Sequence, residues 1–103
     1  MEHRYDRRVN NKNILHIHMS NGLVATGVMQ NISYGGLALN TPIARYLNKN
    51  EIVKADFKLY GEHIMLNSQV VRVNGELVAL MFIEQPSSLK KLLDIQFKRV
   101  AGA

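Results

Sequence analysis

Three arginines stand within five residues of one another near the start of the chain, at Arg4, Arg7 and Arg8. A guanidinium group donates two parallel hydrogen bonds to a phosphate, and the same fork matches the O6 and N7 atoms of guanine. The segment therefore has the chemistry of an anion-binding site. Taken alone, Arg-x-x-x-Arg is a common spacing, and a solvated basic tail is the plainer explanation.

A second group of polar residues occupies positions 31–36, with the sequence Asn-Ile-Ser-Tyr-Gly-Gly. Asn and Ser side chains bond to nearby backbone groups in turns, and glycine adopts conformations that other residues avoid. A glycine pair also lets a ligand approach the backbone closely. The stretch is predicted to be a turn after a strand, and both a structural turn and a ligand-contacting turn have this composition.

Catalytic and metal-binding chemistry have weaker support. The Ser and Thr residues form no recognisable set with a base for nucleophilic catalysis, and the chain has no Cys. His16 and His18 share one face of an expected strand, but no nearby acid or third His completes a metal-ligand pattern, so we expect them to face solvent. His63, beside Glu62, is predicted to be a turn residue. We therefore expect no enzyme, no catalytic residue, no metal ligand and no cofactor.

The charge of the chain lies at its two ends. Its 103 residues carry 13 Lys and Arg against 8 Asp and Glu, a formal net charge of +5 that favours an anionic partner. Residues 13–86 hold five charges of each sign, so the excess comes from residues 1–12 and 87–103. The length and a hydrophobic content of 47% are those of one small domain with a single core.

Several protein classes are excluded by composition. The absence of Cys excludes a disulfide framework. The longest apolar run, Leu77–Ile83, is far shorter than the roughly 20 residues of a membrane span, so we expect no membrane insertion. The first residues also lack the apolar stretch of a secretory signal. A cytoplasmic protein is expected.

Alternating apolar residues predict six short strands in meander order. Asn21-Gly22 and Asn74-Gly75 predict hairpins, because both residue types tolerate positive φ. Gly27 suggests a bulge or bend inside its strand, and Pro42 lies in an irregular connector. The predicted strands cover residues 14–19, 23–30, 37–40, 52–60, 64–73 and 77–83.

After Pro86 the apolar residues recur with helical spacing, which predicts an amphipathic helix over about 87–100. Ser87 or Ser88 can cap its start. The predicted fold is mainly β: a six-stranded antiparallel β-barrel with a C-terminal α-helix packed on it. Residues 1–13 are expected to be a flexible, Arg-rich ligand-binding segment, and residues 14–103 the barrel domain.

The two motifs, Arg4-x-x-x-Arg8 before the first strand and Asn31-x-Ser33-x-x-Gly36 after the second, resemble those of the PilZ domain. This family is a bacterial receptor module for cyclic di-GMP, and its fold is a six-stranded antiparallel barrel with a closing helix. The resemblance extends over nearly the whole chain. Residues 69–73 and 77–82 are similar to the last hairpin of the family.

The resemblance implies a role for each motif residue. Arg4 and Arg8 would reach phosphate and the Hoogsteen edge of guanine, or stack on a base, and Arg7 would add a third fork. Asn31 and Ser33 would contact the second guanine, and Gly36 would keep the backbone clear of it.

Two departures from the commonest family pattern bear on binding. Asn31 stands where many members have Asp, which removes the charge that roughly doubles the strength of a hydrogen bond. His3 rather than Arg precedes Arg4, which leaves one or two bound ligand molecules open. We add Arg72, whose outward guanidinium would flank a base; an exposed strand cation is the alternative.

The expected mechanism is an Arg segment that orders on cyclic di-GMP and changes the surface shown to a downstream protein of unknown identity. One alternative is a barrel that binds single-stranded nucleic acid, but with four Tyr and three Phe the chain has few stacking platforms, so nucleic acid is not the expected partner. The other alternative is a protein-interaction module that uses its basic C-terminal helix and binds no nucleotide.

Overall fold

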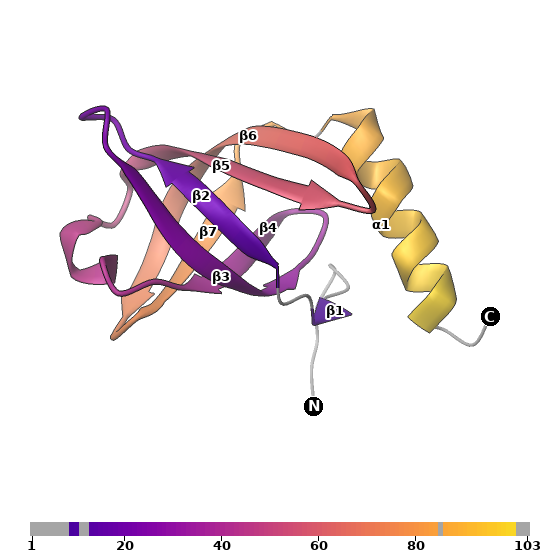
Figure 1. Ribbon diagram of the computed structural model, residues 1–103, viewed down its shortest axis with the longest axis horizontal. Coiled ribbons are helices and arrows are strands. Elements are labelled where there is room, and N and C mark those ends of the chain that lie inside the picture. Colours follow the sequence, from indigo (N-terminus) through magenta and orange to yellow (C-terminus); the bar gives the residue numbers. More distant parts are fainter. Residues whose placement is uncertain (1–8, 11–12, 85, 101–103) are drawn as a thin grey trace.

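The computed structural model describes residues 9–10, 13–84 and 86–100, with side chains for residues 13–84 and 86–95. It contains seven strands, a short 3-10 helix η1 (Ala44–Tyr46) and one α-helix, α1 (Ser87–Val100) (Figure 1). The strands are β1 (Val9–Asn10), β2 (Ile14–His18), β3 (Val24–Ile32), β4 (Gly36–Asn40), β5 (Ile52–Leu59), β6 (Glu62–Asn74) and β7 (Leu77–Phe82). All six predicted strands and the predicted helix are present, whereas β1 was not predicted.

Six of the strands close into an antiparallel barrel in the order β3-β2-β5-β6-β7-β4, with β4 pairing back onto β3. The predicted fold class is confirmed, but the predicted meander order is wrong. The barrel consists of two three-strand meanders, β2–β4 and β5–β7, because β2 pairs with β5 and β4 pairs with β7. The connector over residues 41–50 separates the meanders. Thr41 anchors its start, since its N–H donates to Glu76 O (2.9 Å) and its hydroxyl to Thr26 O (3.0 Å).

The core consists of the inward residues of every barrel strand. In β5, the alternating residues Val53, Ala55, Phe57 and Leu59 are all at most 2% exposed, as the sequence predicts. Helix α1 adds Leu89 and Leu93 to the same core cluster. Burying such a side chain contributes about 1.5–3 kcal/mol, so the barrel holds the helix through these two leucines.

Two one-residue bulges reverse the inside–outside alternation. In β3, Met29 opposes Leu39 and Asn31 opposes Ala38, so Gln30 is the extra residue. Met29 and Ile32 are both fully buried although three positions apart, and Asn31 is therefore turned outward. In β6, Val71 is the corresponding extra residue, between the pairs of Val70 and Arg72.

The strand register at Gly27 is regular, so the predicted bulge lies three residues further on. Gly27 has a different structural cause. A Cβ atom there would lie 2.5 Å from Leu39 Cδ1 and 2.9 Å from Asn40 O. Gly27 therefore lets β4 approach β3 closely.

The two ends of the barrel differ. One end, called here the motif end, carries the turn between β3 and β4, the hairpin of Tyr60 and Gly61, and α1 alongside (Figure 1). Tyr60 and Gly61 have φ of 50° and 80°, the pattern of a type I′ turn. The opposite end carries the hairpins of Gly22 and Gly75, whose positive φ fits the predicted turns. Within the described ranges, no helix has both the length and the apolar character needed to cross a bilayer.

Candidate functional site

The turn at the motif end is a three-residue loop, Ser33–Gly35, closed by a dense set of backbone hydrogen bonds. The N–H of Ser33 donates to Gly36 O over 2.8 Å, which links the two ends of the loop. The carbonyl of Gly35 accepts from the N–H of Phe82 on β7, also over 2.8 Å. The turn is therefore held by hydrogen bonds to both β4 and β7 at the rim of the barrel.

Gly36 is required by the fold itself. A Cβ atom at this position would lie 2.1 Å from Leu80 O and 3.3 Å from Met81 Cα. Only a residue without a side chain lets β4 pair with β7 at this point. The expected role of Gly36 in keeping the backbone clear of a ligand stays a prediction. The close approach of β4 and β7 is a separate, structural reason for glycine at this position.

Ser33 also has a structural role. Its side chain is 1% exposed, and its hydroxyl donates to Gly36 O over 3.3 Å. The hydroxyl proton is therefore used inside the turn, and the lone pairs of the oxygen are what remains for other contacts. The expected contact of Ser33 with a guanine stays a prediction.

The short strand β1 brings the two sequence motifs together. Asn10 pairs with Asn31, and Val9 pairs with Ile32, at the point where β3 enters the turn. Arg8 is the covalent neighbour of Val9 in the sequence. Arg4, Arg7 and Arg8 themselves lie outside the described residues.

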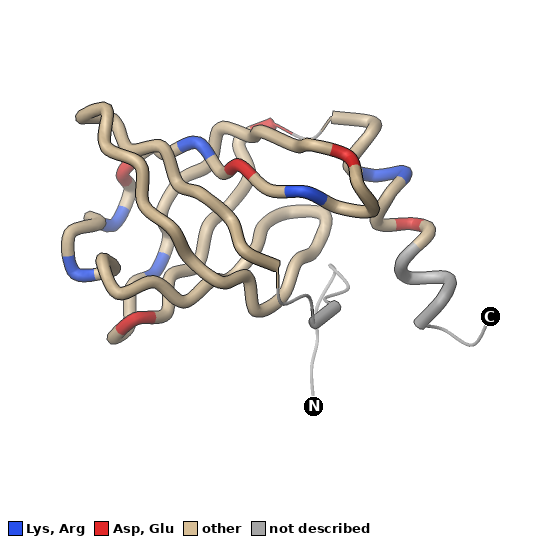
Figure 2. Tube along the Cα trace, in the orientation of Figure 1, with Lys and Arg blue, Asp and Glu red and all other residues tan. Residues whose placement is uncertain are grey.

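The strands that enter and leave the turn are uncharged, and the two charged side chains that contact Tyr34, Lys90 and Asp94 of α1, are paired with each other. Strands β2, β3 and β4 and residues 33–35 contain no Lys, Arg, Asp or Glu, and Figure 2 shows the charged positions on β5, β6, the loops and α1. An anion at the turn would therefore need cations from another segment. The arginines before β1 are the nearest such cations in the sequence, because β1 itself pairs with Asn31 and Ile32 of the second motif.

Arg72 lies on β6 and is exposed, because the bulge at Val71 turns it outward. It opposes Ala79 of β7, which in turn opposes Ala38 of β4. Arg72 is therefore two strands away from β4, the strand that begins at Gly36, and it is not part of the turn. Its expected contact with a base stays a prediction.

An aspartate and two histidines, which no sequence pattern connects, meet on the outer face of β2, β5 and β6. His18 Nε2 lies 2.9 Å from Asp56 Oδ2, and His63 Nε2 is hydrogen-bonded to Asp56 Oδ1. The hydrogen bonds of His18 and then His63 hold the pKa of Asp56 below its usual value of 3.8.

The prediction that His63 is a turn residue is wrong, because it belongs to β6. No short-range pattern could reveal its partner, since Asp56 and the histidines come from three different strands. His16 is exposed, as expected, whereas His18 is half-buried against Asp56. Among the described residues no group of His, Asp or Glu is arranged to hold a metal ion.

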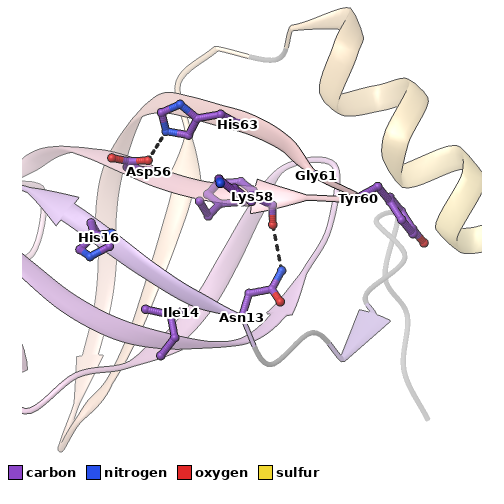
Figure 3. Close-up of a pocket in the computed structure, with 9 residues that line it drawn as sticks. Asn13, Ile14, His16, Asp56, Lys58, Tyr60, Gly61 and His63 are labelled. Atoms are coloured by element: carbon purple, nitrogen blue, oxygen red, sulfur yellow. Dashed lines mark hydrogen bonds and ion pairs between the residues drawn. The ribbon is translucent and has the colours of Figure 1, made fainter.

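A hollow of about 420 Å³ lies next to this cluster, on the outer face of β2 and β5 (Figure 3). Asn13 closes one side by donating from Nδ2 to Lys58 O over 2.9 Å. The hollow contains none of the predicted ligand residues, and its lining has both signs of charge. It is lined by Asn13, Ile14, His16, Asp56, Phe57, Lys58, Tyr60, Gly61 and His63.

A family model described as PilZ domain matches residues 2–97 of the chain, which includes both sequence motifs. No curated protein matches the sequence closely enough to count as a relative.

Solved structures share the fold at low identity. The PilZ domain of CeSA from a cellulose-synthesizing bacterium is 18% identical with a TM-score of 0.72, over 89% of this chain and 96% of that one. The PilZ domain of YcgR from Escherichia coli, described as a structure with c-di-GMP, is 14% identical with a TM-score of 0.75, over 97% and 95%. The MrkH–c-di-GMP complex from K. pneumonia is 19% identical with a TM-score of 0.74, over 98% of this chain and 54% of that one.

Proposed function

The chain belongs to the PilZ domain family, and from this premise we propose that it is a receptor for cyclic di-GMP. The observation that carries the proposal is the pairing of Asn10 with Asn31. Through this pairing, the backbone that follows the Arg-rich segment runs beside the second motif. The descriptions of YcgR and MrkH as structures with c-di-GMP support the choice of ligand.

The charges of the two motifs determine which part of the ligand each of them binds. Cyclic di-GMP has two phosphates and two guanines, whereas β2, β3, β4 and residues 33–35 have no charged residue, and Lys90 beside Tyr34 is paired with Asp94. Arg4 and Arg8 therefore bind phosphate and the Hoogsteen edge of guanine, and Arg7 adds a third guanidinium. Asn31 and Ser33 supply neutral hydrogen-bonding groups to the second guanine, and Arg72 flanks a base from β6.

The proposed receptor signals by changing the surface that it presents to another protein, and it catalyses no reaction. The Arg-rich segment orders around the bound nucleotide and presents a new face to a downstream protein. We place this receptor in the bacterial cytoplasm. Phe57 and Phe82 are buried in the core, at 2% and 5% exposure, so they offer no stacking platform. This favours a dinucleotide over single-stranded nucleic acid as the ligand.

Isothermal titration with cyclic di-GMP tests the proposal, with cyclic di-AMP and GTP as ligand controls. We expect binding of cyclic di-GMP alone, at a measured stoichiometry of one or two. Arg8→Ala removes a charge-assisted contact of roughly 1.5–3 kcal/mol, so its affinity should fall by about ten- to a hundredfold.

Arg45→Ala is the matched control, because Arg45 is an exposed arginine at the opposite end of the barrel. It should bind as tightly as the unmodified protein. No heat with cyclic di-GMP, or equal losses in both variants, contradicts the proposal. A steep dependence of affinity on salt with oligonucleotides would point to nucleic acid instead.

A further inference from the structure

The turn that carries the second motif is tied to helix α1 by three polar side chains. The hydroxyl of Tyr34 donates a hydrogen bond to Asp94 Oδ1 on α1. Lys90, one helical turn earlier, donates from Nζ to Asp94 Oδ2 over 3.3 Å, and the same Nζ lies 5.8 Å from the centroid of the Tyr34 ring. We call Tyr34, Lys90 and Asp94 the turn–helix latch.

The latch lies beside a hollow between the turn and the helix. Leu89 and Leu93 anchor one face of α1 in the barrel core. Beside them a hollow of about 260 Å³ lies between Tyr34 and the first turn of the helix, lined also by Pro86, Ser87, Leu89 and Lys90. Tyr34 also packs against the core cluster to which Leu89 and Leu93 belong, and its polar contacts with Asp94 and Lys90 add a directional connection between the turn and the helix.

The residues on either side of Tyr34 are both held by hydrogen bonds. Ser33 bonds to Gly36 O through both its N–H and its hydroxyl, and the carbonyl of Gly35 accepts from Phe82. A helix held against Tyr34 therefore helps to hold the whole turn in one conformation. The reverse is also true, because a fixed turn keeps the tyrosine hydroxyl in position for Asp94.

We propose that Tyr34 couples the nucleotide site to α1, so that cyclic di-GMP bound at the turn tightens the docking of the helix. The inference rests on the proposed function. A docked helix preorganises the turn and thereby favours binding, and thermodynamic linkage requires bound nucleotide to favour docking by the same factor. The solvent face of α1, which includes Lys91 and Ile95, thus becomes the element that responds to the ligand.

Hydrogen exchange of the α1 amides, measured on the full chain with and without cyclic di-GMP, tests the coupling. In the unmodified protein the nucleotide should slow exchange at residues 92–95 by about fivefold or more. Tyr34→Phe keeps the ring and removes the hydroxyl. It should speed this exchange in the absence of nucleotide, and the slowing by nucleotide should fall below about twofold.

Tyr46→Phe is the control, because Tyr46 is an exposed tyrosine in η1 at the opposite end of the barrel. It should behave as the unmodified protein. Lys90→Gln and Lys91→Gln form a second matched pair that leaves the turn unchanged. Lys90 contacts Asp94, whereas Lys91 contacts no acidic side chain among the described residues, so only Lys90→Gln should weaken the coupling.

Calorimetry on the same samples separates the two ways of failing. Binding of cyclic di-GMP without slower exchange in α1 overturns this inference and leaves the proposed function intact. The same holds if nucleotide slows exchange equally in Tyr34→Phe and Tyr46→Phe. Absence of binding in every variant rejects the proposed function, and this inference is rejected with it.

Discussion

A methyl group at Gly36 has no room, because it would lie 2.1 Å from the carbonyl oxygen of Leu80 on the paired strand. That oxygen belongs to a backbone held in the β4–β7 ladder, so it cannot move aside as a flexible side chain would. We therefore expect Gly36→Ala to lower the free energy of unfolding by about 3 kcal/mol, at the upper end of overpacking costs. Urea denaturation followed by circular dichroism measures the loss.

Gly22→Ala is the matched comparison, because Gly22 has a φ of 91° and a Cβ atom added to it would meet no other atom within 4 Å. Only the strain of positive φ applies there, which costs about 1–2 kcal/mol. A loss at Gly36 no larger than the loss at Gly22 would contradict the steric argument. Ligand binding need not enter the comparison, since both variants are measured without nucleotide.

Two residues of the second motif, Ser33 and Gly36, thus have structural roles that do not depend on a ligand. Ser33 and Gly36 both build the turn: one through its hydroxyl and amide, the other through its missing side chain. Asn31 differs, since its outward position depends on the bulge at Gln30. A substitution of Ser33 or Gly36 that abolishes binding therefore needs a stability measurement beside it, whereas the arginines before β1 report on binding more directly.

At the scale of strands, Asp56 connects β5 to its two neighbours through His18 and His63. These hydrogen bonds lower the pKa of Asp56 in the folded protein below its unfolded value near 3.8. A carboxyl group with a lowered folded pKa adds stability above its unfolded pKa, and this stability is lost as pH falls through the folded pKa. We expect unfolding free energy to fall from about pH 5 to below pH 3.8, with Asp56 contributing on the order of 1 kcal/mol.

Asp56→Asn isolates this contribution. The variant should be less stable at pH 6, and its stability should fall less steeply in acid than that of the unmodified protein. Glu62→Gln makes the same change of charge on β6, at a residue that forms no ion pair among those described, and should leave the pH profile unchanged. Parallel acid profiles for Asp56→Asn and the unmodified protein would be inconsistent with the lowered pKa.

Sequence patterns predicted the elements well because strand and helix periodicity are local properties. Val53, Ala55, Phe57 and Leu59 alternate in the sequence and are all buried in β5. Strand order is not local, so the pairing of β2 with β5 was missed, and with it the contact of His18 with Asp56. The bulge in β3 does have a local signal in the sequence, because Met29 and Ile32 are both apolar although they are three positions apart, which breaks the two-residue alternation of a strand.

At the scale of the whole molecule, the barrel and the two ends of the chain differ in charge. The barrel supplies an uncharged turn, and the excess of positive charge lies in residues 1–12 and 87–103. Strands β3 and β4 contain no charged residue, and Figure 2 shows the charged positions of the barrel on β5, β6 and the connecting loops. The net charge of +5 therefore describes the chain ends and not a broad basic face for a polyanion.

The last prediction concerns the N-terminal segment as a switch. Residues 2–8 contain no aliphatic side chain and a single aromatic one, Tyr5, so they have little apolar surface to bury against the barrel without ligand. Bound cyclic di-GMP offers the arginines two phosphates and two guanine edges, and the segment should then become ordered. Amide order parameters for residues 2–10 should rise when the nucleotide is added, while those of residues 44–50 at the opposite end of the barrel should stay the same. Equal order parameters in both states would mean that the segment does not act as the switch, even if the nucleotide binds.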